Sequence, residues 1–145
     1  MLTTWDGLPI SPEPPNGTTI VVYRRGHEGI EFLLLHRAHH GAEYEGDWAW
    51  TPPSGARLPN EPVDECARRE LLEETGLTLD VQATAYGMES WAIYFAEASM
   101  DHQVVLLDGE HDRYEWVTLE TALARCLPAV VAQGVEYVAS LLQLR

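Results

Sequence analysis

The chain contains no lysine among its 145 residues. All nine basic residues are arginine, and 23 aspartate and glutamate residues bring the formal net charge to −14. The absence of lysine excludes a lysine Schiff base, a Ser-Lys dyad and a P-loop lysine. The negative charge disfavours a long nucleic acid as partner, because polyanions are repelled. A small anionic ligand is compatible with this charge if divalent cations lie between the protein and the phosphate.

Cysteines and long apolar runs are also scarce. Cys66 and Cys126 are isolated in the sequence and are too few for a disulfide framework. No apolar stretch has the length of a membrane span. The N-terminus lacks the basic segment and apolar segment of a secretion signal. We therefore expect a cytoplasmic protein that does not use a membrane as partner.

The order of polar and apolar segments predicts one domain preceded by an arm. Four prolines crowd residues 1–16, which predicts an extended arm laid on the domain. Residues 17–145 contain no repeat or linker and are expected to form a single domain. We expect strands at 18–24, 31–37, 48–50, 90–96 and 114–117, a turn at 52–55, and helices at 61–75, 118–126 and from 128 onward. This order predicts an α/β or α+β class with a mixed sheet.

The helix expected at 61–75 carries three carboxylates at close spacing. Glu70, Glu73 and Glu74 fall within about 100° of one helical face. We expect them to continue an inward-facing stripe, with Arg69 on the opposite side of the helix; the stripe begins with Val63, Cys66 and Ala67. Inward carboxylates need compensation, which hard divalent cations provide. A solvated acidic face is the alternative for such a triplet taken alone.

The segment that contains this helix matches a long motif. Residues 55–77 read G-x5-E-x7-R-E-L-x-E-E-x-G-L. This resembles the complete Nudix box, with every fixed position matched, and a chance match in a chain of this length is below about one in a million. The resemblance implies an α/β/α sandwich with a central mixed sheet. It also implies a pyrophosphohydrolase that uses Mg²⁺ or Mn²⁺ to cleave a phosphoanhydride bond.

The resemblance to the Nudix family implies a role for individual box residues. Arg69 and Glu61 would form an ion pair that orients the site. Glu74 is in addition a candidate for the catalytic base. The metal ligands would be Gly55, through its carbonyl, together with Glu70, Glu73 and Glu74.

The lead-in to the box departs from the family at one position. Trp50-x-x-Pro53-x-Gly55 resembles the family's W-x-x-P-G-G, but Ser54 replaces the first glycine of the pair. If that position requires a positive φ, Ser54 is strained. Otherwise its hydroxyl is free to contact a phosphate or a water molecule.

A second segment with functional character lies at 110–116. It reads E-H-D-R-Y-E-W and resembles a segment of diadenosine tetraphosphate hydrolases and dihydroneopterin triphosphate pyrophosphatases. The resemblance implies that Glu110 is a metal ligand or base and that Tyr114 lies near it. A polar turn followed by a strand with core aromatics is the alternative. Tyr94 resembles a marker of diadenosine polyphosphate hydrolases, and Arg37 ends a strand directed at the site in this family, so both are candidate substrate contacts.

These features together predict an enzyme that hydrolyses a nucleoside or pterin polyphosphate. A diadenosine polyphosphate is the first expectation, and dihydroneopterin triphosphate or a modified nucleoside triphosphate is the alternative. A Nudix module that binds a nucleotide without turnover is an alternative of another class, disfavoured because every box carboxylate is retained. The apolar stripe of the last helix is compatible with core closure or with a homodimer contact.

Overall fold

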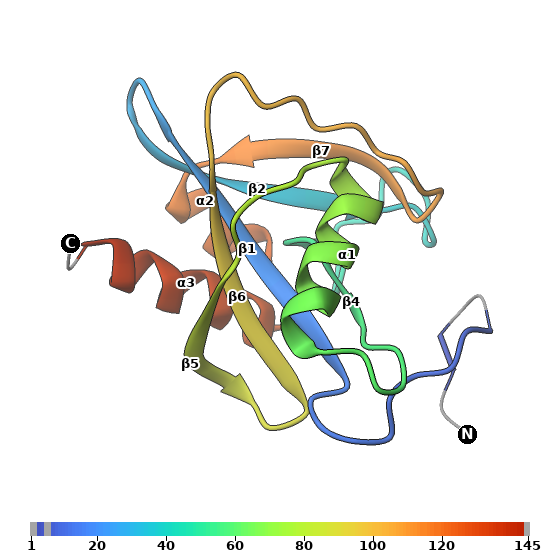
Figure 1. Cartoon of the computed structure of the whole chain (residues 1–145). Coiled ribbons are helices and arrows are strands. Elements are labelled where there is room, and N and C mark those ends of the chain that lie inside the picture. Colours follow the sequence, from blue (N-terminus) through green and yellow to red (C-terminus); the bar gives the residue numbers. More distant parts are fainter. Residues whose placement is uncertain (1–2, 5–6, 144–145) are drawn as a thin grey trace.

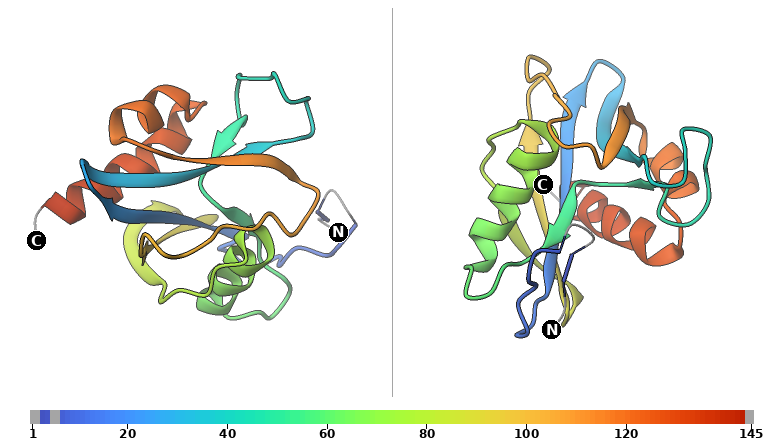
Figure 2. Two further views of the ribbon diagram at one scale, coloured as in Figure 1. Left: turned by 90° about the horizontal axis from the view of Figure 1, so that it is seen from above. Right: turned by 90° about the vertical axis from the view of Figure 1, so that its right-hand side faces the viewer.

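A mixed sheet between two layers of helices forms the body of the protein in a computed structural model that describes residues 3–4 and 7–143. Figure 1 and Figure 2 show α1 on one face of the sheet and α2 with α3 on the other. The elements are β1 (Gly17–Gly26), β2 (Gly29–Arg37), β3 (Trp50–Thr51), β4 (Ser54–Ala56), α1 (Val63–Thr75), β5 (Gln82–Met88), β6 (Trp91–Ala98), β7 (His111–Val117), α2 (Leu119–Arg125) and α3 (Ala129–Gln143). The predicted α/β/α arrangement is confirmed.

The strands of the described part of the chain belong to one seven-stranded sheet. Its main order is β3-β2-β1-β6-β5, with β7 paired to β2 and β4 paired to β1. Strands β1 and β2 form an antiparallel hairpin that pairs Tyr23 with Phe32. The pairing of β1 with β6 is parallel and aligns Ile20 with Tyr94. The sheet is therefore mixed, as the sequence predicts.

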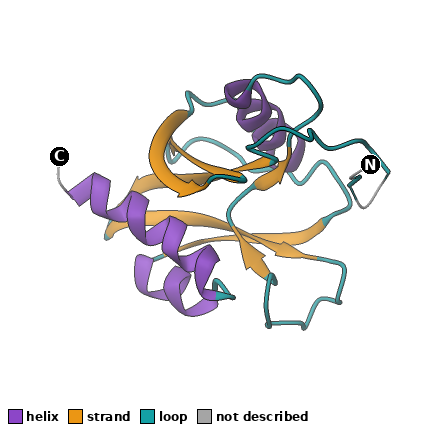
Figure 3. Cartoon of the chain, turned by 90° about the horizontal axis from the view of Figure 1, so that it is seen from below, coloured by secondary structure: helices purple, strands orange, loops and turns teal. Residues whose placement is uncertain are grey.

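Each face of the sheet is covered by a separate apolar cluster. Successive side chains of β1 point to opposite faces, so Val21 and Tyr23 meet the layer of α2 and α3, whereas Ile20 and Val22 meet the layer of α1. Figure 3 shows the two helical layers separated by the strands. Because both faces are buried, β1 and β2 are almost continuously apolar. The apolar face of α3 completes the cluster that contains Val21 and Tyr23. The buried residues that it contributes are Val135, Val138, Ala139 and Leu142.

Helix α1 ends where the sequence predicts. Gly76 has a φ of 73° and donates its backbone N–H to the carbonyl of Leu72 at 2.9 Å. This left-handed conformation is the one that glycine adopts without a Cβ penalty. The face that α1 buries against the sheet contains Cys66, Ala67, Glu70, Leu71, Glu74 and Thr75.

Three segments differ from the sequence-based expectation. The strand expected at 48–50 is observed only as β3 at Trp50–Thr51, because Trp48 has a positive φ and lies in a turn. The turn expected at 52–55 is partly strand, because β4 pairs with β1 and aligns Gly55 with Thr18. Strand β5 was not predicted at all. Its sequence is rich in small residues, and Gly87, with a φ of 126°, lies at an irregularity in the pairing with β6. Small residues and glycine weaken the strand signal, so local pattern does not reveal β5.

The described part of the N-terminal arm leads along the domain to the start of β1 (Figure 1). Residues 1–2 and 5–6 of the predicted arm lie outside the described residues, and Thr3 forms an isolated bridge with Pro9. Ser11 is almost fully buried and donates its backbone N–H to the carbonyl of Arg57 at 2.7 Å. Among the helices described for residues 3–4 and 7–143, none is long and apolar enough to cross a membrane.

Candidate active site

The three box carboxylates of α1 have different environments. Glu74 is 2% exposed, and its Oε1 accepts the backbone N–H of Ser54 at 3.0 Å. Glu70 is also buried, at 9% exposure. Glu73 is not on the inward face, because its side chain is 53% exposed. The expectation of one inward stripe was wrong for Glu73, which lies about 80° of helical rotation from Val63 at the start of the stripe.

Arg69 links the first part of the box to the carboxylates. Its Nε and Nη2 donate to the two carboxylate oxygens of Glu61 at 2.7 and 2.9 Å. Nη2 also donates to the carbonyl of Ala56 at 2.9 Å, while Nη1 reaches Glu70 at 2.9 Å and Glu73 at 3.2 Å. The ion pair implied by the family resemblance is present. The expectation that Arg69 lies opposite the carboxylates was wrong, because its guanidinium extends along α1 between Glu61 and Glu73.

Gly55 holds β4 directly against one of the buried carboxylates. A Cβ at this position would overlap the carboxylate of Glu70. Only glycine therefore permits this approach of strand and helix. The neighbouring Ser54 does not have positive φ, since the described non-glycine residues that do are Trp48 and Asn60. The alternative of a strained Ser54 is wrong, and its side chain lines the cavity described below.

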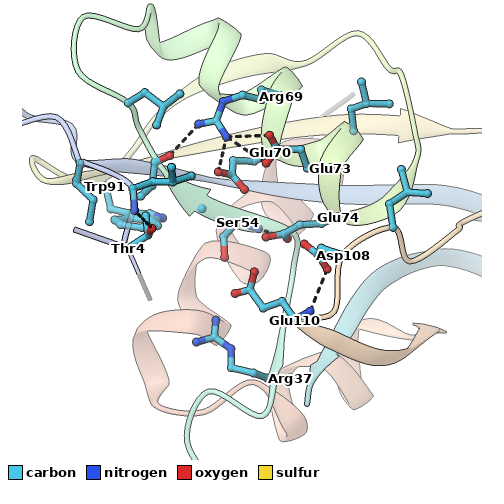
Figure 4. Close-up of a pocket in the computed structure, with 17 residues that line it drawn as sticks. Thr4, Arg37, Ser54, Arg69, Glu70, Glu73, Glu74, Trp91, Asp108 and Glu110 are labelled. Carbon is cyan, nitrogen blue, oxygen red and sulfur yellow. Dashed lines mark hydrogen bonds and ion pairs between the residues drawn. The ribbon is translucent and has the colours of Figure 1, made fainter. Parts of the chain in front are cut away.

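The connection between β6 and β7, together with the first residue of β7, brings three further groups to Glu74. One ligand atom from each of Glu74, Asp108, Glu110 and His111 lies within 4.8 Å of the others. Figure 4 shows the carboxylates of Glu74, Asp108 and Glu110 converging from α1 and from this connection. Glu110 was predicted at the site, whereas Asp108 and His111 were missed. The only sequence signal for them is their position on either side of Glu110, in a segment that also reads as a polar turn.

Burial and mutual repulsion raise the pKa values of Glu70 and Glu74. Burial raises the pKa of Glu74 well above its usual value, and the charges of Glu110 and Glu70 add to this, while the Ser54 N–H opposes it. Burial likewise raises the pKa of Glu70 to about 7, against the opposing effect of Arg69. Both carboxyl groups therefore require either a proton or a nearby cation beyond what Arg69 supplies.

His111 is held in its neutral form. Burial lowers its pKa to about 4, and Arg37 contributes to the lowering while Asp108 opposes it. Nδ1 of His111 is buried without a hydrogen-bond partner among the described residues and lies 3.7 Å from Oδ1 of Asp108. A neutral imidazole with a free ring nitrogen is able to act as a metal ligand.

One cavity contains the carboxylates, and a second cavity adjoins it. The first, of about 580 Å³, contains the box acids together with Asp108 and Glu110. The second, of about 520 Å³, lies over the sheet beside α3, and its lining includes Trp48, Tyr86, Trp91, Ile93 and Gln133. Arg37, Ser54 and Trp91 line both cavities. The side chain of Arg37 therefore lies where the acidic cavity meets the aromatic one, and Figure 4 shows its guanidinium below Glu110.

The two tyrosines expected at the site lie elsewhere. Tyr94 is 4% exposed, and its hydroxyl donates to Asp64 on α1. Tyr114, on β7, is partly exposed. Neither of them lines either of these two cavities. The structure therefore brings Arg37 and Glu110 to the box acids but does not bring Tyr94 or Tyr114 there.

Comparison with known proteins agrees with this geometry. Residues 13–137 match the NUDIX domain family. The chain is 32% identical over 121 residues to the mouse (Mus musculus) bis(5'-nucleosyl)-tetraphosphatase [asymmetrical], which covers 71% of this chain and 78% of that protein. Its identity to the Caenorhabditis elegans protein of the same name is 30% over 118 residues, covering 72% and 79% of the two chains.

Solved structures show the same fold. The structure of a C. elegans Ap4A hydrolase binary complex superposes with a TM-score of 0.71 at 24% identity, over 89% of this chain and 98% of that one. The E. coli dihydroneopterin triphosphate pyrophosphohydrolase gives a TM-score of 0.66 at 18% identity, over 88% and 96%. The fold and the complete box define a pyrophosphohydrolase. The chain belongs to the Nudix family.

Proposed function

We propose that this protein hydrolyses a phosphoanhydride bond of a dinucleoside polyphosphate, with a diadenosine polyphosphate as the first candidate, and that the reaction requires Mg²⁺ or Mn²⁺. The observation that carries the proposal is the convergence of buried Glu74 with Asp108 and Glu110 beside an aromatic cavity. The named activity of the mouse and nematode relatives supports the same substrate class.

The residues at the site fit a hard divalent cation. Carboxylate oxygens are the ligands that Mg²⁺ and Mn²⁺ prefer, and buried carboxyls with raised pKa values gain the compensating charge that they lack. When bound, such an ion lowers the pKa of a water molecule and neutralises charge on the phosphoryl oxygens. The proposed ligands are drawn from the Gly55 carbonyl, Glu70, Glu73, Glu74, Asp108 and Glu110, and His111 is an additional candidate.

The other groups of the site have positioning roles. The Ser54 N–H fixes one oxygen of Glu74 and leaves the second for the site. Arg69 is bound through both carboxylate oxygens of Glu61 and thereby orients Glu70 and Glu73. Glu110 lies within the cluster formed with Glu74, so its carboxylate is the proposed base that accepts the proton of the attacking water, and Glu74 is the alternative base.

The aromatic cavity fits the nucleoside end of the substrate. Trp48, Tyr86 and Trp91 offer flat surfaces on which a base stacks, and the amide of Gln133 offers a hydrogen bond to its edge. Arg37 borders both cavities and is suited to bind the phosphate chain through two N–H groups. Tyr94 and Tyr114 are not among the proposed substrate contacts, because they line neither cavity.

A substrate panel tests the proposal. The panel contains diadenosine polyphosphates, dihydroneopterin triphosphate and modified nucleoside triphosphates, each with Mg²⁺ or Mn²⁺, and chromatography identifies the products. We expect the highest kcat/KM for a diadenosine polyphosphate. Preferential turnover of the pterin or of a nucleoside triphosphate would replace the proposed substrate, and tight binding without turnover of any member would favour a non-catalytic module.

A further inference from the structure

The N-terminal arm forms part of the acidic cavity. Thr4, Leu8 and Ile10 line the same cavity as Glu70 and Glu74. Figure 4 shows Thr4 beside Trp91, to one side of the carboxylates. These three residues precede residue 13, at which the match to the family begins. This part of the cavity therefore lies outside the residues matched to the family.

Hydrogen bonds fix the arm to the strand that carries Gly55. The backbone of Arg57, which directly follows β4, accepts the N–H of Ser11 at 2.7 Å and donates to the carbonyl of Asn16 at 2.8 Å. Its guanidinium donates to the carbonyl of Pro15 at 3.1 Å, and the side-chain amide of Asn16 donates to the carbonyl of Ser11 at 2.8 Å. Ser11 and Arg57 are both buried. The position of the arm is thus coupled to the strand that contacts the buried carboxylate.

Two of the three arm residues that line the cavity, Leu8 and Ile10, are apolar, and the third, Thr4, is uncharged. Leu8 is 50% exposed, Ile10 is partly buried, and Leu58 and Trp91 line the cavity next to them. Residues 1–16 contain no basic side chain. A terminal phosphate in this part of the cavity would find no basic side chain on the arm, whereas a nucleoside would find apolar surface to cover.

We propose that the arm is a substrate-selecting wall. Leu8 and Ile10 contact the second nucleoside at the far end of the polyphosphate chain, while the first nucleoside occupies the aromatic cavity beyond Arg37. The wall thereby favours a polyphosphate with a nucleoside at both ends over a polyphosphate that ends in a free phosphate. This inference rests on the proposed function, because it assigns the two ends of the same substrate.

The test compares diadenosine tetraphosphate with adenosine tetraphosphate, which has the same number of phosphates but one free end. We expect Leu8→Ser to lower kcat/KM for diadenosine tetraphosphate about five- to tenfold through lost apolar contact and to leave adenosine tetraphosphate unchanged. Leu8→Arg adds a cation and is expected to raise kcat/KM for the free-ended nucleotide. The control is Met100→Ser, which removes an apolar side chain of similar exposure outside the cavity. Thermal unfolding verifies that all variants are folded.

The possible outcomes distinguish a failure of the proposed role of the wall from a failure of the proposed reaction. Equal effects of Leu8→Ser on both nucleotides, or no effect on either, would overturn the role of the wall while the reaction stands. If the wild type binds both nucleotides and cleaves neither, the proposed reaction is wrong. The ratio of their dissociation constants in wild type and Leu8→Ser, measured by calorimetry, then decides the role of the wall. A wild type that does not bind diadenosine tetraphosphate would contradict both.

Discussion

Ser54 and Glu74 are joined by a hydrogen bond of 3.0 Å from the backbone N–H of β4 to the carboxylate of α1. One residue further along β4, Gly55 lies so close to Glu70 that no side chain fits between them. A three-residue strand thus contacts both buried carboxylates of the helix. This contact explains the number of residues between Gly55 and the glutamates of the box. The loop after β4 and the first turns of α1 must fit between them.

Replacement of Gly55 by alanine is expected to damage both stability and activity. The added Cβ overlaps the Glu70 carboxylate, so strand and helix must separate. We expect a loss of about 1–3 kcal/mol in the free energy of unfolding by denaturant, and a fall in kcat. Gly109→Ala is the matched control, because a Cβ there meets no atom within 4 Å. A Gly55→Ala protein as stable and active as this control would contradict the proposed contact.

Arg69→Lys is expected to lower activity or metal affinity about 10- to 100-fold. The guanidinium makes a bidentate contact with Glu61 and also donates to Glu70. A single ammonium group does not make both contacts at once. Metal titration followed by calorimetry, together with steady-state kinetics, measures the effect. Arg68→Lys, at the exposed neighbouring position, serves as control and should behave as wild type. Indistinguishable results for the two variants would exclude a positioning role for Arg69.

Stability of the metal-free protein should report the burial of Glu70. Its pKa rises from the usual 4.5 to about 7, so between these pH values the folded protein retains a proton that the unfolded chain releases. The contribution of Glu70 to the free energy of unfolding is therefore fully present below pH 4.5 and is lost as the pH rises through 7. Relative to Glu70→Gln, wild type should lose on the order of 3 kcal/mol of unfolding free energy across this window.

Chelator-treated protein and urea unfolding at several pH values provide this measurement. Because His111 titrates in both proteins, its contribution, which has the opposite sign, cancels in the comparison. Added Mg²⁺ or Mn²⁺ should restore the stability of wild type above pH 7 and have less effect on Glu70→Gln. A stability difference that does not change with pH would show that Glu70 titrates normally.

Arg37→Ala is expected to raise KM about tenfold or more with a smaller change in kcat, as the loss of a charge-assisted contact to the phosphate chain predicts. Arg37 lines both cavities, and its Nε is buried without a hydrogen-bond partner among the described residues. Arg25→Ala, at a largely exposed position on β1, is the control for a general loss of positive charge. Equal KM values for the two variants would place the phosphate chain away from Arg37.

The box and its helix were predictable because their signals are contiguous in the sequence. Residues 55–77 carry the motif, and Gly76 ends α1 as the composition predicts. The burial of Glu73 was predicted wrongly, because three carboxylates spaced by three and four residues span a wide sector of the helix. Only Glu70 and Glu74 face the sheet, and Glu73 lies at the edge of that sector beside Arg69.

The remaining parts of the site depend on contacts between distant segments. Asp108 and His111 join Glu74 only because β7 pairs with β2 and returns its preceding loop to α1. Tyr94 was expected at the substrate, but the parallel pairing of β6 with β1 directs its side chain under α1, where it meets Asp64. Neither the pairing nor the direction of a side chain is encoded by the residue type alone. The contribution of Leu8 to the cavity was missed for the same reason.

Turnover of diadenosine tetraphosphate by wild type, Glu74→Gln and Glu73→Gln, with Mg²⁺ or Mn²⁺ and with chelator, tests the central claim most directly. Glutamine retains an acceptor for the Ser54 N–H, so Glu74→Gln should fold normally, and exposed Glu65→Gln is the control. We predict metal-dependent nucleotide release that chelator abolishes and that each of the two substitutions lowers at least about a hundredfold in kcat. Wild-type rates in Glu74→Gln, or undiminished release with chelator, would contradict the account.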